Sequence, residues 1–501
     1  MARRIFAVVL SLALLGCADR SSDEACRQTA LDGTCIGVTR PWICTDRFCT
    51  TDAACRRVWY VDGETASPGD GSAALPLGTP AAAAALAIAG DCIALAPGTY
   101  PGCALPGGVS LLGAGADAVQ ITTPLTASGG QGALLRGFAL DVNGVALSLS
   151  SAPQTRLEQV RVQRARRVGL DVRRSPGLVL KNLEIRGVAA EQVPPVSGGP
   201  PASFGIGLLL VAGSSTRVDT TLIEGCATLG VLASDSPLEL ARSDVSRSGH
   251  HGVALDSRTG TAARLELTRI EESRGVGLLV IGGELVLRDS AVGRTAYSDG
   301  FAANVQAQDA RVEIRGSRIH DAAGQGLVLH GCGGTLRESR IEQNDERGVH
   351  IEGSARGLEL SDNAIVDNQR AGLICIAADP VRVRGGEISR TASRMVLDGV
   401  RAASVGDGVQ VLAGSGVTLQ QLTLRDNPRY GVIVDAGRAS LTDVGIGGSE
   451  APVVAQSTGP GDVTLQRVTD LDGDPVSLSV PVAAALVGAA AGARAPLPQA
   501  P

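Results

Sequence analysis

Short alternations of apolar and polar residues dominate the chain from about residue 144 onward. Each unit begins with glycine, continues as apolar, variable, apolar, and passes through a turn into a second apolar stretch that ends near isoleucine or valine. Two examples are GVALDSRTGTAARLELTRIEES and GVHIEGSARGLELSDNAIVDNQ. Because a period of two places neighbouring side chains on opposite faces, the pattern predicts β-strands.

The units recur about every 23 residues and align on their first residue. The predicted anchors are Gly144, Gly169, Gly207, Gly230, Gly252, Gly277, Ala302, Gly326, Gly348, Gly372, Gly408 and Gly431. The positions one and three residues after the anchor are apolar in all twelve units, which predicts two columns facing a common core. Stacked coils of this length predict an all-β parallel solenoid. A leucine-rich horseshoe would need an L-x-x-L-x-L-x-x-N frame and a helical half, which the chain lacks.

Two spacings between anchors, 38 and 36 residues, exceed the period. They predict insertions near residues 188–204 and 389–406, and loops on a rigid scaffold are frequent sites of function. The position two residues after the anchor is predicted to face outward, yet it is apolar in several units: Leu209, Leu232, Leu279, Val328, Ile374 and Ile433. We expect this outer face either to contact another protein or to lie beneath the insertions.

The segment before the repeats carries a second set of signals. It contains Tyr60-Val61-Asp62, a glycine-rich loop, an alanine-rich stretch from Ala81 to Ala89, and then GDCIALAPGTYPG from Gly90. This order resembles the N-terminal cap of right-handed parallel β-helix proteins of the pectate-lyase-like superfold. The resemblance implies a right-handed single-stranded parallel β-helix of roughly 14 coils over residues 58–475. Members of that superfold include lyases, hydrolases, epimerases and adhesins, so the fold alone does not name an activity.

The first residues have the features of a bacterial export signal. A basic start precedes an apolar run from Ile5 to Leu15, which is too short to span a bilayer. The run ends in LLGC, which resembles the lipobox of bacterial lipoproteins. The resemblance implies a signal peptide over residues 1–16, a lipid-modified Cys17 and, because Ala18 follows in place of aspartate, anchoring to the outer membrane or cell surface. A secreted protein without a lipid is the alternative.

Cysteine usage fits an exported chain. Residues 17–57 are predicted to form a lipid-anchored stalk with disulfides among Cys26, Cys35, Cys44, Cys49 and Cys55. Because five is an odd number, one of these thiols is expected to be free or paired elsewhere. A zinc site is the competing interpretation, but CxxC pairs and histidines are absent from this segment. Cys92 and Cys103 flank a turn and are predicted to pair with each other. The net charge is −6 and no basic block stands out, so nucleic acid is not an expected partner.

Candidate chemistry lies in two places, the turn after the second strand of each unit and the second insertion. The ligand-binding candidates there are Asp321, Asn344, Asp367, Asn368, Asp426, Arg390, Arg394 and Arg401. Stacked aspartate and asparagine residues either satisfy backbone groups between coils or form a rim that binds glycan hydroxyls or calcium, and both interpretations remain open. No other cofactor is expected.

Catalysis on the resembled superfold is implied to need acids on neighbouring coils. Its lyases use a calcium-binding cluster of acids with a basic residue, and its hydrolases use paired aspartates. The chain has His250-His251-Gly252 and Gly406-Asp407-Gly408, but without a second aspartate, so both are interpreted as turn and anchor residues. No catalytic residue and no metal ligand is therefore assigned.

Two of the five histidines, His330 and His350, lie close together in the sequence. The alignment of the units places them in different outward columns. His330 is predicted to stack on Glu352, while His350 lies between Val328 and Ile374. We therefore expect an ion pair between His330 and Glu352 rather than a metal or catalytic site.

The expected protein is a surface lipoprotein whose rigid β-helix binds a polysaccharide or another envelope protein. The alternative is a polysaccharide lyase, epimerase or hydrolase. The binding interpretation is favoured because the alignment shows no compact set of outward acids with a base. Residues 476–501 are apolar and rich in alanine and proline, which predicts a C-terminal cap or tail rather than a membrane span.

We expect Cys17→Ala to release the protein from the membrane fraction, because the thiol is the predicted site of lipid attachment. Fractionation of cells followed by immunodetection measures this. Ser11→Ala, within the apolar run, is the matched control and should leave the distribution unchanged. A Cys17→Ala protein that stays with the membranes contradicts the lipoprotein interpretation.

Overall fold

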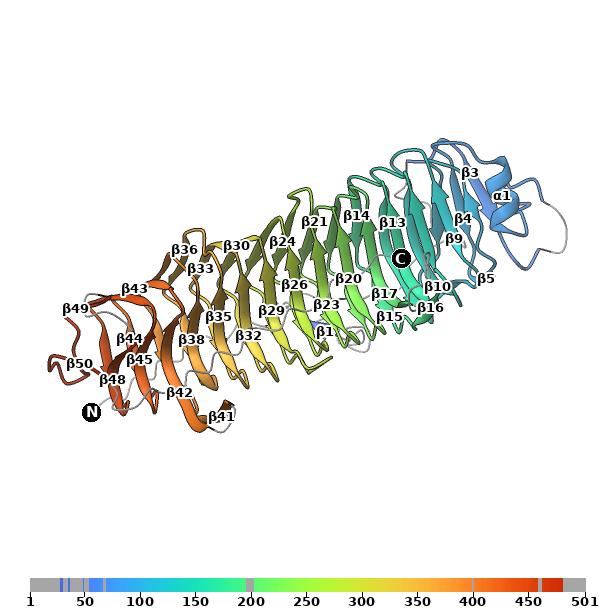
Figure 1. Ribbon diagram of the computed structural model, residues 1–501. Helices are drawn as coiled ribbons and strands as arrows, with labels where there is room; N and C mark the ends of the chain where they lie inside the picture. Colours follow the sequence, from blue (N-terminus) through green and yellow to red (C-terminus); the bar gives the residue numbers. More distant parts are fainter. Residues whose placement is uncertain are drawn as a thin grey trace, which may run out of the picture.

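The computed structural model describes residues 28–29, 35–36, 48, 54–65, 69–194, 202–398, 401–457 and 462–480. These residues form an elongated right-handed parallel β-solenoid of about 16 turns (Figure 1), which confirms the predicted fold class with more coils than expected. The predicted signal peptide and Cys17 lie outside the described residues. Within the described part of the chain, no helix is long and apolar enough to cross a membrane.

A small cap begins the solenoid. It consists of β3 (Val58–Val61), α1 (Pro80–Leu86), β4 (Cys92–Leu95) and β5 (Gly98–Tyr100), at the blue end of Figure 1. The hydroxyl of Thr79 accepts a hydrogen bond from the amide of Ala82 at 3.2 Å and so caps the helix. The helix ends at Leu86, before the alanine-rich stretch ends at Ala89. The backbone is already extended at Ala87, where the chain turns toward β4.

Each coil contributes one strand to each of three faces. Face one contains β11 (Leu147–Ser150), β13 (Arg167–Arg173), β17 (Ala202–Val211), β20 (Leu229–Ser234), β23 (His251–Asp256), β26 (Val276–Ile281), β29 (Ala303–Gln308), β32 (Gln325–His330), β35 (Arg347–Glu352), β38 (Arg370–Ile376), β42 (Arg401–Leu412), β45 (Tyr430–Asp435) and β48 (Ala451–Gln456). Face two contains β14 (Leu178–Lys181), β18 (Thr216–Asp219), β21 (Leu238–Ala241), β24 (Ala262–Glu266), β27 (Glu284–Arg288), β30 (Arg311–Arg315), β33 (Gly333–Arg337), β36 (Leu358–Ser361), β39 (Val381–Arg384), β43 (Gly416–Gln420), β46 (Arg438–Thr442) and β49 (Val463–Gln466).

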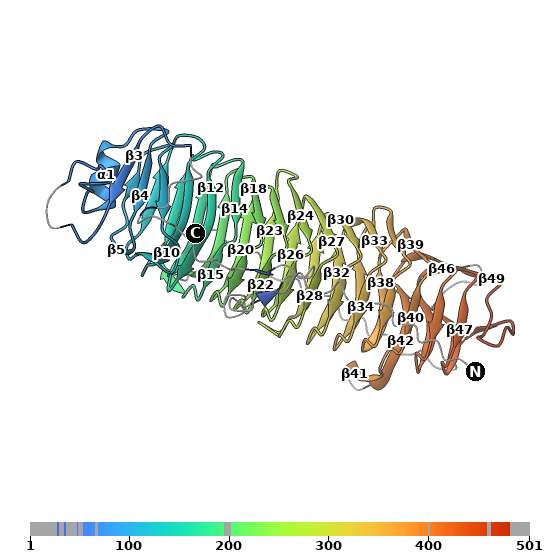
Figure 2. The ribbon, with the colours of Figure 1, turned by 180° about the vertical axis from the view of Figure 1, so that it is seen from behind.

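Face three is built from strands of only three residues. They are β15 (Glu184–Arg186), β19 (Leu222–Glu224), β22 (Asp244–Ser246), β25 (Arg269–Glu271), β28 (Ala291–Gly293), β31 (Arg318–His320), β34 (Arg340–Glu342), β37 (Ala364–Val366), β40 (Glu387–Ser389), β44 (Thr423–Arg425) and β47 (Gly445–Gly447). Figure 2 shows faces two and three from the side opposite Figure 1. On all three faces each strand pairs in parallel with its counterpart one coil later, as β20 does with β23.

The register confirms the two inward columns in ten of the twelve predicted units and corrects them in two. Leu147 pairs with Leu170, so the anchor of the first unit is Ala146 and not Gly144. Leu278 pairs with Val305, so the anchor near residue 302 is Asn304 and not Ala302. Both errors are shifts of two residues. Because such a shift leaves every side chain on the same face of its strand, the apolar–polar alternation of the sequence does not reveal it.

Close packing requires glycine at most of the anchors, although Ala146 and Asn304 occupy two of them. A Cβ on Gly230 would lie 2.6 Å from the carbonyl oxygen of Gly252 on the next coil and 2.4 Å from a methyl group of Val245. Gly348 is similarly placed, 2.7 Å from the carbonyl oxygen of Gly372. These separations are shorter than van der Waals contact, so a side chain here would push neighbouring coils apart.

The core is a stack of aliphatic side chains. The middle residue of each strand on face three points inward and is no more than 2% exposed, as in Ile270, Ile319 and Ile341. Each such residue contributes about 1.5–3 kcal/mol through burial. Because the middle residue fills the core, the first and third residues of these strands face outward.

The apolar outward column of face one is buried rather than free. Leu209, Leu232 and Leu279 are no more than 1% exposed and form a second apolar cluster outside the main core. Phe204 and Phe301, which belong to two protrusions between faces three and one, are members of this cluster. This part of the column therefore lies beneath the protrusions, one of the two arrangements expected.

The structure corrects the predicted cysteine pairing. Cys92 forms a disulfide with Cys55, with Cα atoms 5.5 Å apart, and Cys103 is a free thiol. The reason is topological, because Cys92 begins β4 beside Val58 of β3, whereas Cys103 precedes a strand on face one. Pairing among Cys26, Cys35, Cys44 and Cys49 lies outside the residues whose side chains are described.

We expect Leu329→Asp to destabilise the solenoid strongly, by about 3 kcal/mol or more, because it places a charge in the apolar core. Leu329 is 0% exposed. Thr418→Asp is the matched control, since Thr418 faces outward beside Arg382. Chemical denaturation of both variants measures the effect, and an unchanged midpoint for Leu329→Asp would refute the inward assignment.

Candidate functional site

Face three carries a dense set of charged side chains. Most outward positions of its strands, together with the residue that follows each strand, are arginine, acidic or histidine over seven coils. We define this charged strip by Glu184, Arg186, Glu224, Asp244, Arg247, Arg269, Glu271, Glu272, Arg294, Arg318, His320, Asp321, Arg340 and Glu342. Parallel pairing places equivalent positions one coil apart, at about 4.8 Å, so these groups form continuous rows.

Ion pairs connect the strip from coil to coil. Glu224 binds Arg186 at 2.8 Å and also Arg247. Asp244 binds Arg269 at 3.2 Å. Each pair joins neighbouring coils. Each carboxylate therefore holds a guanidinium group in a fixed position through charge-assisted hydrogen bonds.

These residues surround a hollow of about 650 Å³ on face three. Its lining is entirely polar and consists of Arg186, Glu224, Asp244, Ser246, Arg247, Arg269, Glu271, Glu272 and Arg294. The carboxylate side chain of Asp244 is fully buried, whereas the side chain of Arg247 is 61% exposed. The acids therefore form the floor of the hollow, and arginines stand at its edge.

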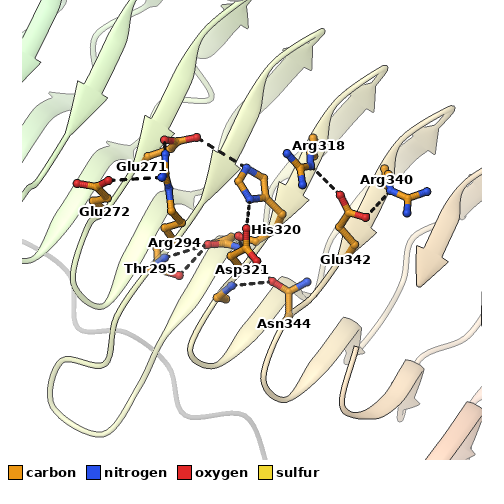
Figure 3. A network of polar contacts seen from close by, with 12 residues as sticks. Glu271, Glu272, Arg294, Thr295, Arg318, His320, Asp321, Arg340, Glu342 and Asn344 are labelled. Carbon is orange, nitrogen blue, oxygen red and sulfur yellow. Dashed lines mark hydrogen bonds and ion pairs between the residues drawn. The ribbon is translucent and has the colours of Figure 1, made fainter. Parts of the chain in front are cut away.

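His320 occupies a notch in the middle of the strip (Figure 3). A Cβ on Gly293 would lie 2.6 Å from the imidazole, so the ring fits only because this position lacks a side chain. The Nδ1 atom lies 2.7 Å from a carboxylate oxygen of Asp321, and Nε2 lies 3.8 Å from a carboxylate oxygen of Glu271. Burial lowers the pKa of His320, and the hydrogen bond to Asp321 opposes that effect.

The strip continues beyond His320. The Nε atom of Arg318 donates to Glu342 at 2.7 Å, and Arg340 also binds Glu342 (Figure 3). On the other side, Glu271 binds Arg294, whose guanidinium lies 3.7 Å from Glu272. The imidazole is therefore flanked by two arginine–glutamate groups.

The arrangement suits recognition of hydroxyl and carboxylate groups. Arginine and carboxylate side chains can each form two parallel hydrogen bonds, and here they alternate along a rigid face. The imidazole, held by one carboxylate and facing another, is placed to accept or donate a proton. Among the described residues, no group of three or more histidine, cysteine, aspartate or glutamate side chains is arranged to hold a metal ion.

The ligand candidates named from the sequence divide into three groups. Asp321, Asp367, Asp426 and Arg390 lie on the outer corner of face three. Each has a positive φ of 53–56°, and Asp367 binds Arg390 at 2.7 Å. Their side chains thus reach solvent at the edge of the charged strip.

Asn344 and Asn368 lie inside the solenoid and not on the rim. Asn344 accepts a hydrogen bond from Asn304 at 3.0 Å and donates one to Asn368 at 2.8 Å. Asn368 in turn donates to the backbone carbonyl of Ile341 at 2.9 Å. This ladder satisfies buried backbone groups, which was one of the two interpretations left open.

The two remaining candidates belong to the second insertion, which forms a hairpin of β41 (Arg394–Asp398) and the start of β42. Arg394 is exposed and donates to the carbonyl of Asp345. The side chain of Arg401 lies outside those that the structure describes.

The predicted histidine columns are confirmed by the register. His330 pairs with Glu352, and its Nδ1 atom lies 3.2 Å from a carboxylate oxygen of that residue. His350 pairs with Val328 and Ile374, is fully buried, and contacts Gln325 through Nδ1 at 2.9 Å. The pair was expected at the surface, but His330 is only 2% exposed.

The charged strip itself was missed in the sequence. Its signal was the recurrence of R-I-E at 269–271 and 340–342 with R-I-H at 318–320. Aligning the units on their second strand instead of their first would have brought these three motifs into one column. No sequence pattern predicts the notch at Gly293, because the notch depends on how the ring of His320 is oriented toward the neighbouring coil.

Comparison with known proteins supports the fold. The family model described as right handed beta helix region matches residues 230–388 and 299–445. Among curated proteins, no sequence match to this chain was found.

Several solved structures are similar. The periplasmic alginate epimerase AlgG is 13% identical, with 75% of this chain and 79% of that chain covered and a TM-score of 0.32. The catalytic unit of a GH87 α-1,3-glucanase from Streptomyces thermodiastaticus is 15% identical, with 79% and 64% covered and a TM-score of 0.33. The A-module of the Azotobacter vinelandii mannuronan C-5 epimerase AlgE6 is 15% identical, with 80% and 93% covered and a TM-score of 0.29. At these values none of them assigns a reaction to this chain.

We expect stability to fall as the pH drops below about 6.5, because burial lowers the pKa of His350 from 6.5 to about 3. The unfolded chain binds a proton in this window and the folded chain does not, so the slope is about 1.4 kcal/mol per pH unit for this group. His350→Gln should flatten the dependence between pH 6 and roughly pH 4, whereas His250→Gln should not. Denaturation curves at several pH values test this, and equal slopes for wild type and His350→Gln would disprove it.

Proposed function

We propose that this protein binds polysaccharide along the charged strip of face three, with the polar hollow as its principal subsite. The observation that carries the proposal is the hollow itself, about 650 Å³ in volume and lined only by polar side chains. Most small-molecule sites are largely apolar, so an all-polar hollow favours a ligand rich in hydroxyl or charged groups.

The shape of the strip favours a polymer. Equivalent groups repeat once per coil along a straight, rigid face, so a chain of similar units can contact several coils in succession. The hollow contains four arginines and four acids, so its charges balance near neutral pH. This balance suits neutral sugars and uronic acids, and it does not favour nucleic acid, whose binding needs an excess of positive charge.

The strip is not the main interaction that holds the coils together. Backbone pairing and the aliphatic core already join every coil, and ion pairs between exposed side chains typically contribute only about 0–1 kcal/mol. Arg247 and Arg294 are more than half exposed. These arginines neutralise the largely buried carboxylates of Glu224 and Glu271, and they are already ordered before a ligand arrives, which is consistent with a binding role.

The proposed setting is the bacterial surface. A lipid on Cys17 would anchor the chain to the outer membrane, and the cysteine-rich segment before residue 58 would separate the β-helix from the bilayer. In this setting face three, which runs along the length of the rod, would be exposed to extracellular or envelope polysaccharide.

A catalytic role is the second candidate, and His320 is the observation that favours it. The imidazole is oriented by Asp321 at 2.7 Å and faces Glu271 at 3.8 Å. Arg294 and Arg318 flank it, as a clamp for a uronic-acid carboxylate would. A lyase or epimerase needs such a base beside a neutralised carboxylate, whereas a hydrolase would use the acids.

We expect binding of the full-length protein to an array of neutral and uronic-acid oligosaccharides. Arg294→Gln and Glu271→Gln should each weaken binding about tenfold or more, because each removes a charge-assisted hydrogen-bonding group. Arg382→Gln on face two is the matched control and should bind as the wild type does. Wild-type protein that binds no glycan, or strip variants that bind normally, would contradict the proposal.

Incubation with uronic-acid and neutral polysaccharides separates the two candidate functions. Binding without catalysis predicts no new reducing ends, no unsaturated products and no change in uronate configuration by NMR. The catalytic candidate predicts one of these products and its loss in His320→Gln, with binding largely retained. A product formed equally by His320→Gln would remove His320 as the base.

A further inference from the structure

Large apolar side chains are exposed at only a few described positions. Six of them lie near the two ends of the solenoid: Leu75, Leu86, Ile88, Leu471, Leu478 and Val480. The other two, Tyr297 and Met395, lie along its body and are 46% and 59% exposed. Aromatic residues make up only 2% of the chain, so an exposed tyrosine here is an informative exception.

Both residues belong to protrusions between faces three and one. Tyr297 immediately precedes a turn that is closed by an antiparallel bridge between Ser298 and Phe301. Met395 lies on β41, which projects at the lower edge of the rod in Figure 1. The two protrusions thus rise from the same edge, several coils apart.

The two protrusions contact one turn, at residues 345–346. The hydroxyl of Tyr297 donates to a carboxylate oxygen of Glu346 at 3.2 Å. From the other side, Arg394 donates to the carbonyl of Asp345 and lies 3.4 Å from the amide oxygen of Gln369. The ring of Tyr297 therefore borders a polar floor that Arg394 also contacts.

The polar floor spans two coils. Arg370 lies 3.6 Å from Glu346, and the amide of Gln369 donates to the carboxylate of Asp345 at 2.9 Å. The side chains of Glu346 and Arg370 are 21% and 23% exposed, so ligand atoms can reach them. We name Tyr297, Glu346, Gln369 and Arg370 the rim bay.

We infer that the rim bay is a second sugar subsite, in which a pyranose ring stacks on Tyr297 while its hydroxyls bind Glu346, Gln369 and Arg370. This inference rests on the proposed function and extends it from the hollow to the edge of face one. A pyranose has a C–H face and a hydroxyl-bearing edge, and the bay offers an apolar ring beside planar hydrogen-bonding groups.

The geometry of Tyr297 supports this assignment. Its hydroxyl is tied to Glu346, so the ring is held in place and binding costs little conformational entropy. Arg294 of the hollow lies only three residues before Tyr297, in the segment that joins β28 to β29. One polysaccharide chain can therefore occupy the hollow and continue to the bay.

The test measures array binding of oligosaccharides of two to roughly eight units, neutral and uronic-acid, by variants of the full-length protein. We expect Tyr297→Ala to weaken binding of the longer oligosaccharides about tenfold, because it removes the stacking surface. Tyr297→Phe keeps the ring and should bind within about threefold of wild type. Leu86→Ala, an equally exposed apolar residue on the cap, is the matched control and should change nothing.

The outcomes separate this inference from the proposed function. Loss in both Arg294→Gln and Tyr297→Ala, with unchanged melting curves, supports both subsites. Loss in Arg294→Gln with normal binding by Tyr297→Ala overturns the rim bay and leaves the hollow. A wild-type protein that binds no member of the array contradicts the proposed function, and the rim bay with it.

Discussion

Parallel pairing between successive coils is the constraint on which the rest of this structure depends. Each strand must bond its counterpart one coil later, residue for residue, so any position repeats as a column along the rod. Inward columns must then be aliphatic, and the anchors must be glycine where a Cβ would meet the next carbonyl oxygen, as at Gly230. Outward columns need be neither aliphatic nor glycine, so charged and polar side chains can occupy them.

The same constraint decides what could be predicted from the sequence. Inward columns were predictable because every unit reports the same apolar requirement, and the stacking of His330 on Glu352 followed from counting residues per coil. The anchors at Ala146 and Asn304 were misplaced because a shift of two residues preserves the alternation. The disulfide between Cys55 and Cys92 was missed because it joins the segment before β3 to the start of β4, 37 residues further along the chain.

The candidate site was harder to predict than the fold. The site forms only when the three-residue strands that carry Arg269, Glu271 and His320 lie side by side. The contact between His320 and Glu271 also requires that Gly293 has no side chain. Asn344 and Asn368 show the opposite error, since residues typical of ligand rims are used inside the stack. Residue type alone did not distinguish a side chain that hydrogen-bonds to buried backbone groups from one that faces solvent.

A division of roles among the faces follows. Face one is covered by apolar contacts near the protrusions that contain Phe204 and Phe301, face two carries ion pairs such as Arg288–Glu313, and face three carries ordered charges around the polar hollow. The most direct measurement is a crystal structure of the protein with a bound oligosaccharide that it retains on an array. The account predicts sugar density in the hollow between Glu224 and Glu271. Density confined to face one or face two would contradict it.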